Sequence, residues 1–502
     1  MRNKFYLTTP LYYINASPHI GHSYTTIAAD TLARYMRHLL GEKQVWLLTG
    51  TDEHGQKIEK AATDAGLKPQ AFADKMALRF KELWKDLDIS YNDFIRTTEK
   101  RHTTFVGKVL EILYEKGDIY QAQYQGWYCT PCETFWTETQ ILEQNCPDCK
   151  RPVEHISETN YFFKLSKYQD WLTGYINGHA DFIQPANRRE EVLSFLKLNK
   201  LTDLCVSRPK ERLSWGIPLP FSKDHVTYVW FDALVNYISA VGAFDTGGHY
   251  NSKWWPADLH LIGKDILRQH AIYWPIILRA LDIEPPKTIF AHGWWLIEMN
   301  KMSKSRGNVV SPSDMVKKFG IDVYRYFLLR DVPFGLDGNF SEEAIVKRFN
   351  SDLANDLGNL VYRTLTMIEK YFTGDIPKDG IASGSQAKQI KSKLEELGLE
   401  IKEALVSPDI HFISALEDIW GLVNMANKYI EDTKPWILDK EGKTEELKGF
   451  IRLLVEVIRE VAEDVSPFMP HTADSIMAQL GKDKIKKGKP LFPRIDNPAT
   501  KN

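Results

Sequence analysis

Apolar residues near the start of the chain alternate between short strand-like runs and a longer helical stretch. Residues 4–9 and 44–49 are short, apolar and rich in β-prone side chains, so we expect each run to form a buried strand. Residues 19–40 between them predict a helix that ends at Gly41, because glycine favours a helix C-terminus. This order of elements predicts a parallel α/β sheet, in which ligands bind beyond the carboxyl ends of the strands.

The hydrophobic pattern changes twice further along the chain. Over residues 117–223 two cysteine pairs and short aromatic strands interrupt the α/β pattern. The α/β pattern returns at residues 226–240, 260–283 and 288–296. Amphipathic helical stretches then follow at residues 341–371, 386–406, 411–432 and 445–463.

These changes predict the domain organisation. We expect a Rossmann-like parallel-sheet catalytic domain that is split by a small zinc-knuckle insert and followed by an α-helical bundle. The predicted boundaries are 1–116 and 224–296 for the two halves of the catalytic domain, 117–223 for the insert, 297–340 for a loop region and 341–502 for the bundle.

Composition narrows the class of protein. With 502 residues, of which 43% are hydrophobic and 26% charged, the chain can build a large core. No apolar run is long enough to cross a bilayer and the N-terminal stretch is too polar for a signal sequence, so we expect a cytoplasmic protein without a membrane partner. The net charge of −2 gives no overall attraction to nucleic acid. Five lysines within residues 482–489 are predicted to form a solvated tail.

Two histidines open the predicted helix directly after the first strand, in Pro18-His19-Ile20-Gly21-His22. A helix N-terminus presents unpaired N–H groups and a partial positive charge, which suits a phosphate, and both rings can donate to the same anion. Gly21 leaves room for a flat base against the backbone. The alternative is an ordinary proline-initiated helix with surface histidines.

A second group of phosphate-binding side chains lies far downstream, in Lys301-Met302-Ser303-Lys304-Ser305. Two lysines and two serines in a short loop suit a mobile clamp on a triphosphate. On composition alone, an exposed basic loop is the alternative.

Together, these two motifs, in this order, resemble the two signatures of class I aminoacyl-tRNA synthetases. The resemblance implies that an amino-acid carboxylate attacks the α-phosphorus of ATP, and that the aminoacyl group of the resulting adenylate then passes to the 2′-hydroxyl of tRNA. It implies Mg²⁺ with the ATP. It assigns catalysis to His19, His22, Lys301 and Lys304, and ATP binding to Gly21, Gly263, Asp265, Met302, Ser303 and Ser305.

Three aromatic clusters fit a dry, shaped pocket for a thioether side chain. They are Leu11 with Tyr13, then Trp230 with Ala233 and Tyr237, and then Ile266, His270 and Trp274, which are four apart and expected on one helix face. Core packing is the alternative for each cluster alone. Their order and spacing resemble the methionine pocket of methionyl-tRNA synthetases, and Asp52 matches the carboxylate that holds the α-ammonium group.

Four of the five cysteines form two close pairs, Cys129-x-x-Cys132 and Cys146-x-x-Cys149. In a cytosolic protein such pairs favour metal ligation over disulfides. Four thiolates complete a tetrahedral site, so we expect one structural Zn²⁺ with no open position for catalysis. Four unligated buried cysteines are the alternative, and Cys205, in a predicted buried strand, is given no role.

In the helical region, Asn355, Asn359 and Arg363 are four apart and share one predicted helix face. Trp436 follows Pro435 at a helix–loop junction, where an exposed aromatic ring can stack on an unpaired base. A solvated polar face is the alternative. These positions match the anticodon-reading residues of the methionyl family, which implies recognition of the CAU anticodon.

The resemblance extends from about residue 4 to 463 and implies that ATP is used to ligate L-methionine to tRNA(Met). Another class I synthetase, such as the cysteinyl type, and a small nucleotidyltransferase on the same fold are the rival readings. A non-catalytic tRNA-binding relative is disfavoured by the intact histidine and lysine motifs. We expect a monomer, because no further oligonucleotide-binding module follows the helices.

Overall fold

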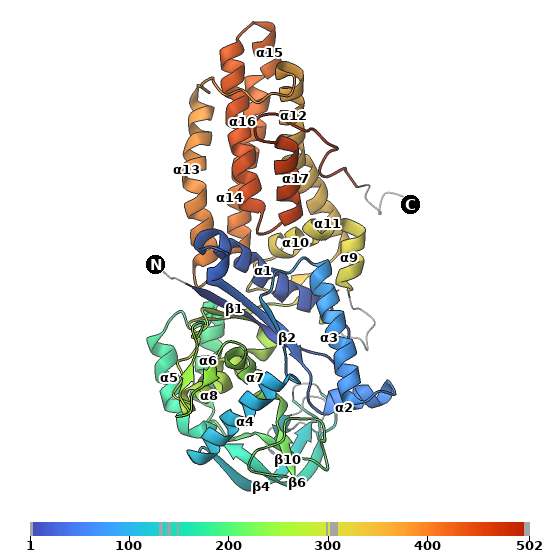
Figure 1. The fold of residues 1–502 in the computed structure, drawn as a ribbon, viewed down its shortest axis with the longest axis vertical. Helices are drawn as coiled ribbons and strands as arrows, with labels where there is room; N and C mark the ends of the chain where they lie inside the picture. Colours follow the sequence, from blue (N-terminus) through green and yellow to red (C-terminus); the bar gives the residue numbers. More distant parts are fainter. Residues whose placement is uncertain are drawn as a thin grey trace. The chain divides into compact units, whose positions relative to one another are not determined.

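The computed structural model describes residues 4–129, 134–136, 138, 141, 143–147, 150–297, 300–301 and 310–495. The chain divides into two compact units, residues 1–292 and 293–502 (Figure 1). The boundary lies close to the predicted end of the catalytic domain at residue 296.

The first unit is an α/β structure. Its strands are β1 (Phe5–Tyr13), β2 (Val45–Asp52), β3 (Asp93–Arg96), β4 (Ile119–Cys129), β5 (Thr134–Trp136), β6 (Glu154–Phe163), β7 (Ile183–Gln184), β8 (Leu204–Cys205), β9 (Ser207–Pro209), β10 (His225–Thr227), β11 (Ala243–Phe244), β12 (Tyr250–Asn251), β13 (Leu259–Gly263) and β14 (Ile289–His292). Its α-helices are α1 (Ile20–Leu40), α2 (Gln56–Asp64), α3 (Pro69–Asp86), α4 (Lys100–Glu115), α5 (Gln169–Gly178), α6 (Ala186–Leu198), α7 (Val229–Ser239) and α8 (Trp274–Ala280). Short helices are the 3-10 turns η1 (Glu42–Gln44), η2 (Leu165–Tyr168) and η3 (Lys264–Ile266) and the π-helix η4 (Gln269–Tyr273).

A six-stranded sheet forms the centre of this unit, in the order β3-β2-β1-β13-β14-β7, and all of its pairings are parallel. The chain leaves β1 towards β2 on one side, and β13 returns on the other side. The strand order therefore reverses at β1, and in open α/β sheets ligands bind at the carboxyl end of such a switch point. The predicted parallel sheet is confirmed.

Strand β1 is longer than the predicted 4–9 and runs through Pro10 to Tyr13. Its register against β2 shifts between Thr8 and Leu11, at the position of the proline. A proline cannot donate a ladder hydrogen bond, so an irregularity here lets the strand continue beyond it. The extension brings the ends of both strands together, with Tyr13 opposite Asp52.

The predicted insert is only partly separate from the main sheet. Residues 119–163 and 204–205 build an antiparallel sheet of their own, in the order β5-β4-β6-β8. Strand β7, however, pairs with β14 in the large sheet, and side chains of α5 and α6 join the main core. The chain thus returns to the catalytic sheet inside the stretch 117–223, because the apolar faces of α5 and α6 need that core for burial.

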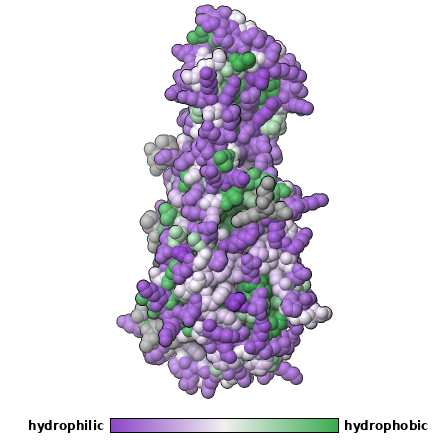
Figure 2. Space-filling view, turned by 90° about the vertical axis from the view of Figure 1, so that its left-hand side faces the viewer, coloured by the Kyte–Doolittle hydropathy of each residue, from purple (hydrophilic) through white to green (hydrophobic). Residues whose placement is uncertain are grey.

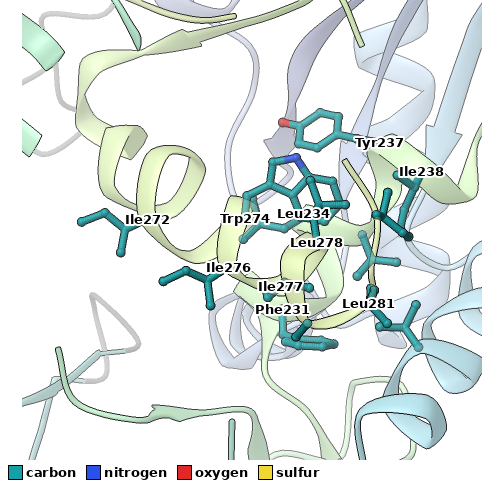
Figure 3. Close-up of a cluster of buried hydrophobic side chains, with 14 of the residues drawn as sticks. Phe231, Leu234, Tyr237, Ile238, Ile272, Trp274, Ile276, Ile277, Leu278 and Leu281 are labelled. Carbon is teal, nitrogen blue, oxygen red and sulfur yellow. The ribbon is translucent and has the colours of Figure 1, made fainter. Parts of the chain in front are cut away.

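The main hydrophobic core includes the apolar faces of α7 and α8. Phe231, Leu234 and Tyr237 of α7 lie against Trp274 and Leu278 of α8 in the same buried cluster (Figure 3).

Two histidines are enclosed in this core. The Trp274 indole N–H donates to Nε2 of His260 at 3.2 Å, so His260 carries its proton on Nδ1 and donates it to the Thr8 hydroxyl at 2.7 Å. Burial, with the neighbouring His270 as a second cause, lowers the pKa of His260 well below its usual value. Burial also lowers the pKa of His270 to about 4. Both rings are therefore neutral at pH 7.

The second unit is mostly helical. Its helices are α9 (Pro312–Phe319), α10 (Ile321–Arg330), α11 (Glu342–Arg348), the π-helix η6 (Phe349–Gly358), α12 (Asn359–Phe372), α13 (Ser385–Val406), α14 (Phe412–Thr433), α15 (Pro435–Lys440), α16 (Thr444–Val465) and α17 (Pro470–Leu480). Short strands β15 (Trp295–Ile297), β16 (Asn300–Lys301) and β17 (Gly338–Asn339) form a small sheet. The predicted helical bundle is confirmed, with the buried faces of α12, α14 and α16 at its centre.

One expectation for this unit was wrong. The lysine-rich stretch near the C-terminus is not a solvated tail, because its backbone is hydrogen-bonded to the helical unit. Ile485 N–H donates to Gly374 O at 2.9 Å, and Ile376 N–H donates to Asp483 O at 2.8 Å. The segment is anchored by the buried Ile485, which the charge run obscures in the sequence.

The exposed surface of the helical unit is mostly hydrophilic on the face shown in Figure 2, with isolated hydrophobic spots. Within the described residues, no helix combines the length and apolarity required to span a bilayer.

Acid should destabilise the first unit through its buried histidines. Because folding lowers the pKa of His260 and His270, their stabilising contribution is present above the unfolded pKa of about 6.5 and is lost as the pH falls below it. Each histidine should cost about 1.3 kcal/mol of unfolding free energy between pH 7.0 and 5.5. Urea unfolding at pH 7.0 and 5.5 measures this loss.

Between pH 7.0 and 5.5, the variant His260→Gln should lose less stability than the wild type, by about 1.3 kcal/mol. The matched control is His249→Gln, because the His249 side chain is 84% exposed. Equal pH slopes for His260→Gln and the wild type would contradict the argument.

Candidate active site

The paired histidines begin helix α1 at the switch point of the sheet. His19 is the N-cap residue, with an extended backbone, and its Nδ1 accepts a hydrogen bond from Gly21 N–H at 3.1 Å. Nδ1 of His22 accepts one from His19 N–H at 3.1 Å. The two imidazoles thus form a reciprocal capping box, a role more usual for serine and glutamate. Their ring centroids are 3.9 Å apart.

This capping arrangement fixes the tautomer of both rings. A nitrogen that accepts from a backbone N–H carries no proton, so a neutral ring must hold its proton on Nε2. His19 and His22 each therefore have an Nε2–H donor. Gly21 suits this geometry, because a Cβ there would lie 3.0 Å from the His19 ring and would press the ring out of place.

His22 is held by aromatic neighbours. Its ring makes edge contacts with Tyr12 at 5.0 Å and with Phe80 at 5.5 Å between centroids. Burial, followed by the adjacent His19, lowers the pKa of His22 well below its usual value. His22 therefore acts as a neutral donor at pH 7.

The carboxyl ends of β1 and β2 bring two predicted substrate residues together. Tyr13 pairs with Asp52, and Leu11 pairs with Gly50. Gly50 is required by this close approach, since a Cβ would lie 1.9 Å from the Ile95 carbonyl oxygen on β3. Asp52 is buried at the end of β2, and Leu11 and Tyr13 are partly buried.

Glu53, the residue after Asp52, is clamped from one side. Its fully buried carboxylate accepts two hydrogen bonds from Arg96, at 2.7 and 2.9 Å, and one from the Thr51 hydroxyl at 2.6 Å. Trp215 donates its indole N–H to the Glu53 carbonyl at 2.6 Å. A bidentate arginine contact gives both energy and a fixed orientation, so this part of the turn is held rigidly.

His54, the next residue, is clamped from the other side. Its Nδ1 lies 2.6 Å from Oδ2 of Asp232 on α7, and the other oxygen of Asp232 lies 2.7 Å from Nε2 of His102. Nδ1 of His102 is 2.7 Å from the Ser239 hydroxyl. Burial raises the pKa of Asp232, but His54 and His102 lower it by more, so the net shift is downward and Asp232 stays ionised.

The residues predicted for the methionine pocket lie on α7 and on the helices after β13. Tyr237 and Trp274 are fully buried and part of the main core (Figure 3). Trp230 and Ile266 are partly buried. The Tyr237 hydroxyl lies 2.7 Å from Nε2 of His270. Ala233 faces inward on α7 and is also buried.

The stretch through Ile266, His270 and Trp274 is helical, but it is not one regular α-helix. Ile266 ends a 3-10 turn, His270 lies in a π-helix and Trp274 begins α8. A π-helix has a wider repeat than an α-helix, so the sequence pattern predicted the helix but not its type. His270 Nδ1 still reaches the Ile266 carbonyl oxygen, at 2.9 Å.

The carboxyl ends of β13 and β14 hold the predicted ribose and base residues. Gly263 pairs with His292, and a Cβ on Gly263 would come 2.7 Å from Oδ1 of Asp265. His292 is buried, and its Nε2 lies 2.7 Å from the Thr25 hydroxyl on α1. The sequence prediction missed His292, although its place at the end of a buried strand could have indicated it.

The sequence prediction also missed the side chains that clamp the turn after β2. Glu53 and His54 stand in the run Gly-Thr-Asp-Glu-His-Gly, so two ionisable residues directly after Asp52 were a signal. Their partner Asp232 gave no local signal, because 178 residues separate it from His54.

Arg208 lines a small cavity together with Gly55 and Tyr228, beside the turn after β2. Its guanidinium lies 5.1 Å from the centroid of the Tyr128 ring and 4.5 Å from that of Tyr228. Such stacking on aromatic rings stabilises a buried arginine.

The lysine motif is only partly within the described residues. Lys301 ends strand β16 in the second unit. Met302, Ser303, Lys304 and Ser305 lie outside the described residues, so the closure of this loop over the histidines stays a prediction.

Two of the four predicted zinc ligands are described. Cys129 and Cys146, the first members of the two pairs, are fully buried and belong to one small cluster with Val153. Cys132 and Cys149 lie outside the described residues, and among those that are described no group of three metal-binding side chains occurs.

The predicted anticodon residues are brought together on the helical unit. Asn355 and Asn359 are exposed and their side chains lie 3.5 Å apart. Arg363 forms an ion pair with Glu431 at 3.7 Å, close to the end of α14. Trp436, five residues after Glu431, is 50% exposed. An exposed tryptophan at this junction fits the predicted base-stacking role.

Comparisons with known proteins agree with this architecture. The model of class I tRNA synthetases (M) matches residues 5–155 and 152–365, and the anticodon-binding domain of tRNA ligases matches residues 387–497. The methionine–tRNA ligase of Clostridium acetobutylicum is 48% identical, and that of Caldanaerobacter subterraneus subsp. tengcongensis is 49% identical, each over 99% of this chain. The chain spans 79% and 80% of their lengths.

A solved structure gives the same result. The methionyl-tRNA synthetase of Mycobacterium tuberculosis in complex with methionyl-adenylate aligns with a TM-score of 0.92 and 38% identity, covering 98% of this chain and 100% of that one. Together these matches cover both units of the fold. The chain therefore belongs to the methionyl-tRNA synthetase family of class I tRNA synthetases.

Proposed function

We propose that the chain ligates L-methionine to tRNA(Met) through methionyl-adenylate, with AMP and pyrophosphate as the other products. The observation that carries this proposal is the pair of Nε2–H donors on His19 and His22, which begin α1 after the strand whose end pairs with Asp52. The family membership and the relative bound to methionyl-adenylate support the same reaction.

In the first half-reaction, the methionine carboxylate attacks the α-phosphorus of ATP and pyrophosphate leaves. The protein need not form a bond in this step, since positioning and fixed positive donors suffice. His19 and His22 donate Nε2–H bonds to the phosphate oxygens as charge spreads onto them. The neutral state of His22 suits this role, because it donates without needing to gain or lose a proton.

The downstream motif supplies Lys304 for the charge that develops on the phosphates, with Lys301 in a weaker assisting role. Met302, Ser303 and Ser305 of the same motif bind ATP. Gly21 leaves space for the adenine base. A fixed donor of this type is commonly worth about 3 kcal/mol of transition-state stabilisation.

Methionine is held at both of its ends. The Asp52 carboxylate binds the α-ammonium group, with Leu11 and Tyr13 beside it. Trp230, Ala233, Tyr237, Ile266, His270 and Trp274 surround the side chain. Gly263 and Asp265 hold the ribose and base of ATP, and Mg²⁺ accompanies its phosphates.

Asp232 acts as a positioning residue for methionine. It joins the turn that carries Asp52 to helix α7, which carries the side-chain pocket. The ammonium ligand and the pocket wall are thereby fixed relative to each other. Positioning within a fraction of an ångström is what such supporting hydrogen bonds provide.

A structural zinc fits the small insert. Two thiols from different pairs converge in one buried cluster, as a four-thiolate site requires. Cys129, Cys132, Cys146 and Cys149 would hold the ion, which when bound supplies a cross-link between the two knuckle loops. It takes no part in the reaction.

On the helical unit, Asn355, Asn359, Arg363 and Trp436 read the CAU anticodon, with the exposed indole stacking on a base. Stacking of this kind is worth about 1–3 kcal/mol per base. We further propose that the protein acts in the cytoplasm as a monomer.

The function is tested by pyrophosphate exchange with a panel of amino acids, followed by aminoacylation of mixed tRNA. Methionine should support exchange, and cysteine should not. Only tRNA that carries a CAU anticodon should be charged. Exchange with cysteine but not methionine would favour the cysteinyl rival, and exchange without any charging of tRNA would favour a nucleotidyltransferase.

The variant Asp232→Asn should raise the KM for methionine in pyrophosphate exchange about tenfold, which corresponds to about 1.4 kcal/mol. The KM for ATP should stay within a factor of about two, because Gly263 ends β13 and Asp265 follows it in η3, on the other side of β1 from the turn after β2.

The matched control for this variant is Ser239→Ala. It removes the outer hydrogen bond to His102 but leaves the His54–Asp232 contact intact. Its KM for methionine should match the wild type. If Asp232→Asn lowered only the unfolding temperature, or raised both KM values equally, Asp232 would have no positioning role.

Native protein should contain one zinc ion per chain by elemental analysis. Cys146→Ser should lose that ion, whereas Cys205→Ser should keep it, because Cys205 lies on β8, away from the cluster of Cys129 and Cys146. Thermal unfolding of the wild type in a chelator should shift to lower temperature. Zinc-free native protein with freely reactive thiols would rule out the site.

A further inference from the structure

Residues 481–495, named here the terminal segment, are held in an ordered path by hydrogen bonds to the helical unit. Lys486 N–H donates to Gln479 O at 2.7 Å, and Gly488 N–H donates to the Gln479 side chain at 2.9 Å. At the other end, Ile495 and the Asn350 side chain exchange two hydrogen bonds, at 2.9 and 3.0 Å.

The path of the terminal segment follows the helix that carries the proposed anticodon residues. Lys487 lies over the Tyr362 ring at 4.9 Å and forms an ion pair with Glu369 at 2.8 Å. Further along, Phe492 contacts Phe349 with ring centroids 5.8 Å apart. The segment therefore runs back beside α12 and η6, as its dark-red coil in Figure 1 indicates.

The terminal segment is strongly basic. It contains six lysine or arginine residues and one aspartate, in a chain whose net charge is −2. Five of these cations are exposed, namely Lys482, Lys484, Lys486, Lys489 and Arg494. Ile485 is buried between two of them and anchors the backbone, and the ammonium group of Lys484 lies 3.4 Å from the Asp375 carboxylate.

The basic surface continues into the neighbourhood of Asn355. Asn355, Asn350, Lys347 and Arg494 line one open groove. Tyr362, which is 38% exposed, stands three residues after Asn359 on the same helix and so on a neighbouring part of its surface. Cations, amide groups and an exposed ring are thus adjacent, which is the composition of a surface that binds RNA.

We propose that the terminal segment binds the sugar–phosphate backbone of the tRNA beside the anticodon, while Asn355, Asn359 and Trp436 read its bases. This inference rests on the proposed function. Phosphate is the matching partner because five exposed cations lie within one segment of 15 residues, 481–495, and the backbone of that segment is already held by hydrogen bonds. Binding then releases counterions from the RNA with little further loss of chain entropy. Contacts to phosphate position a nucleic acid without reading its sequence.

The test uses the full chain with Lys486, Lys489 and Arg494 all changed to Gln. The matched control changes Lys388, Lys391 and Lys402 to Gln, which removes the same charge from exposed positions on α13. Aminoacylation of tRNA(Met) is measured over a series of salt concentrations, and methionine-dependent pyrophosphate exchange is measured in parallel.

The terminal-segment variant should raise the KM for tRNA about tenfold near 0.15 M salt. The slope of log(kcat/KM) against log[salt] should become shallower by about two to three, since each phosphate contact contributes roughly 0.7–0.9 to it. Its pyrophosphate exchange and unfolding midpoint should match the wild type. The α13 control should keep the wild-type KM and slope.

A wild-type KM and salt slope in the terminal-segment variant would overturn this inference while leaving the proposed function intact. That result would also be expected if the terminal segment served an acidic protein or a lipid surface. An equal effect in both triple variants would mean that only overall charge matters, and would overturn it as well. Failure of the wild-type chain to charge any tRNA would instead overturn the proposed function.

Discussion

The reversal of strand order at β1 is the constraint on which the proposed active site depends. Because β2 pairs on one side of β1 and β13 on the other, the carboxyl end of β1 borders both halves of the sheet. Helix α1 begins there, and its N-terminal positive charge is directed to the same place. Residues that are far apart in sequence, such as Asp52 and Gly263, thus border one region without any flexible loop to hold them.

Hydrogen bonds at the start of α1 and in the turn after β2 then fix the orientation of the side chains in the proposed site. A capping box made of serine and glutamate would satisfy the start of α1 equally well, but it would present no N–H donor to a phosphate. With His19 and His22 in those positions, the same hydrogen bonds that complete the helix also set both tautomers. In the turn after β2, Glu53 and His54 are bound on opposite sides, which fixes the backbone beside Asp52. In both histidines, the ring nitrogen that caps the helix differs from the one that is proposed to bind phosphate.

The sequence predicted what depends on short-range pattern. The strand–helix–strand order, the start of α1 at the histidines, the bundle helices and the exposure of Trp436 all follow from local periodicity, capping and turn chemistry. Contacts made by folding were not predictable in this way. Asp232 meets His54 across 178 residues, and neither residue carries a local sign of the other. Two further features were not predicted for a related reason. The π-helix at His270 and the docking of the lysine-rich segment through Ile485 both depend on tertiary packing, and the local sequence pattern does not show that packing.

The internal hydrogen bonds of the proposed pocket also limit its selectivity. Nδ1 of His270 faces the Ile266 carbonyl oxygen and so carries the proton, which leaves Nε2 to accept from the Tyr237 hydroxyl. Because both ring nitrogens of His270 are engaged, this ring offers no further hydrogen bond to a substrate with a polar side chain. Polar amino acids are then excluded by the cost of desolvating them, whereas a side chain shorter by one methyl group loses only about 1–3 kcal/mol. Homocysteine differs from methionine in this way, so a shaped apolar pocket alone cannot reject it, and discrimination has to come from a chemical step after binding.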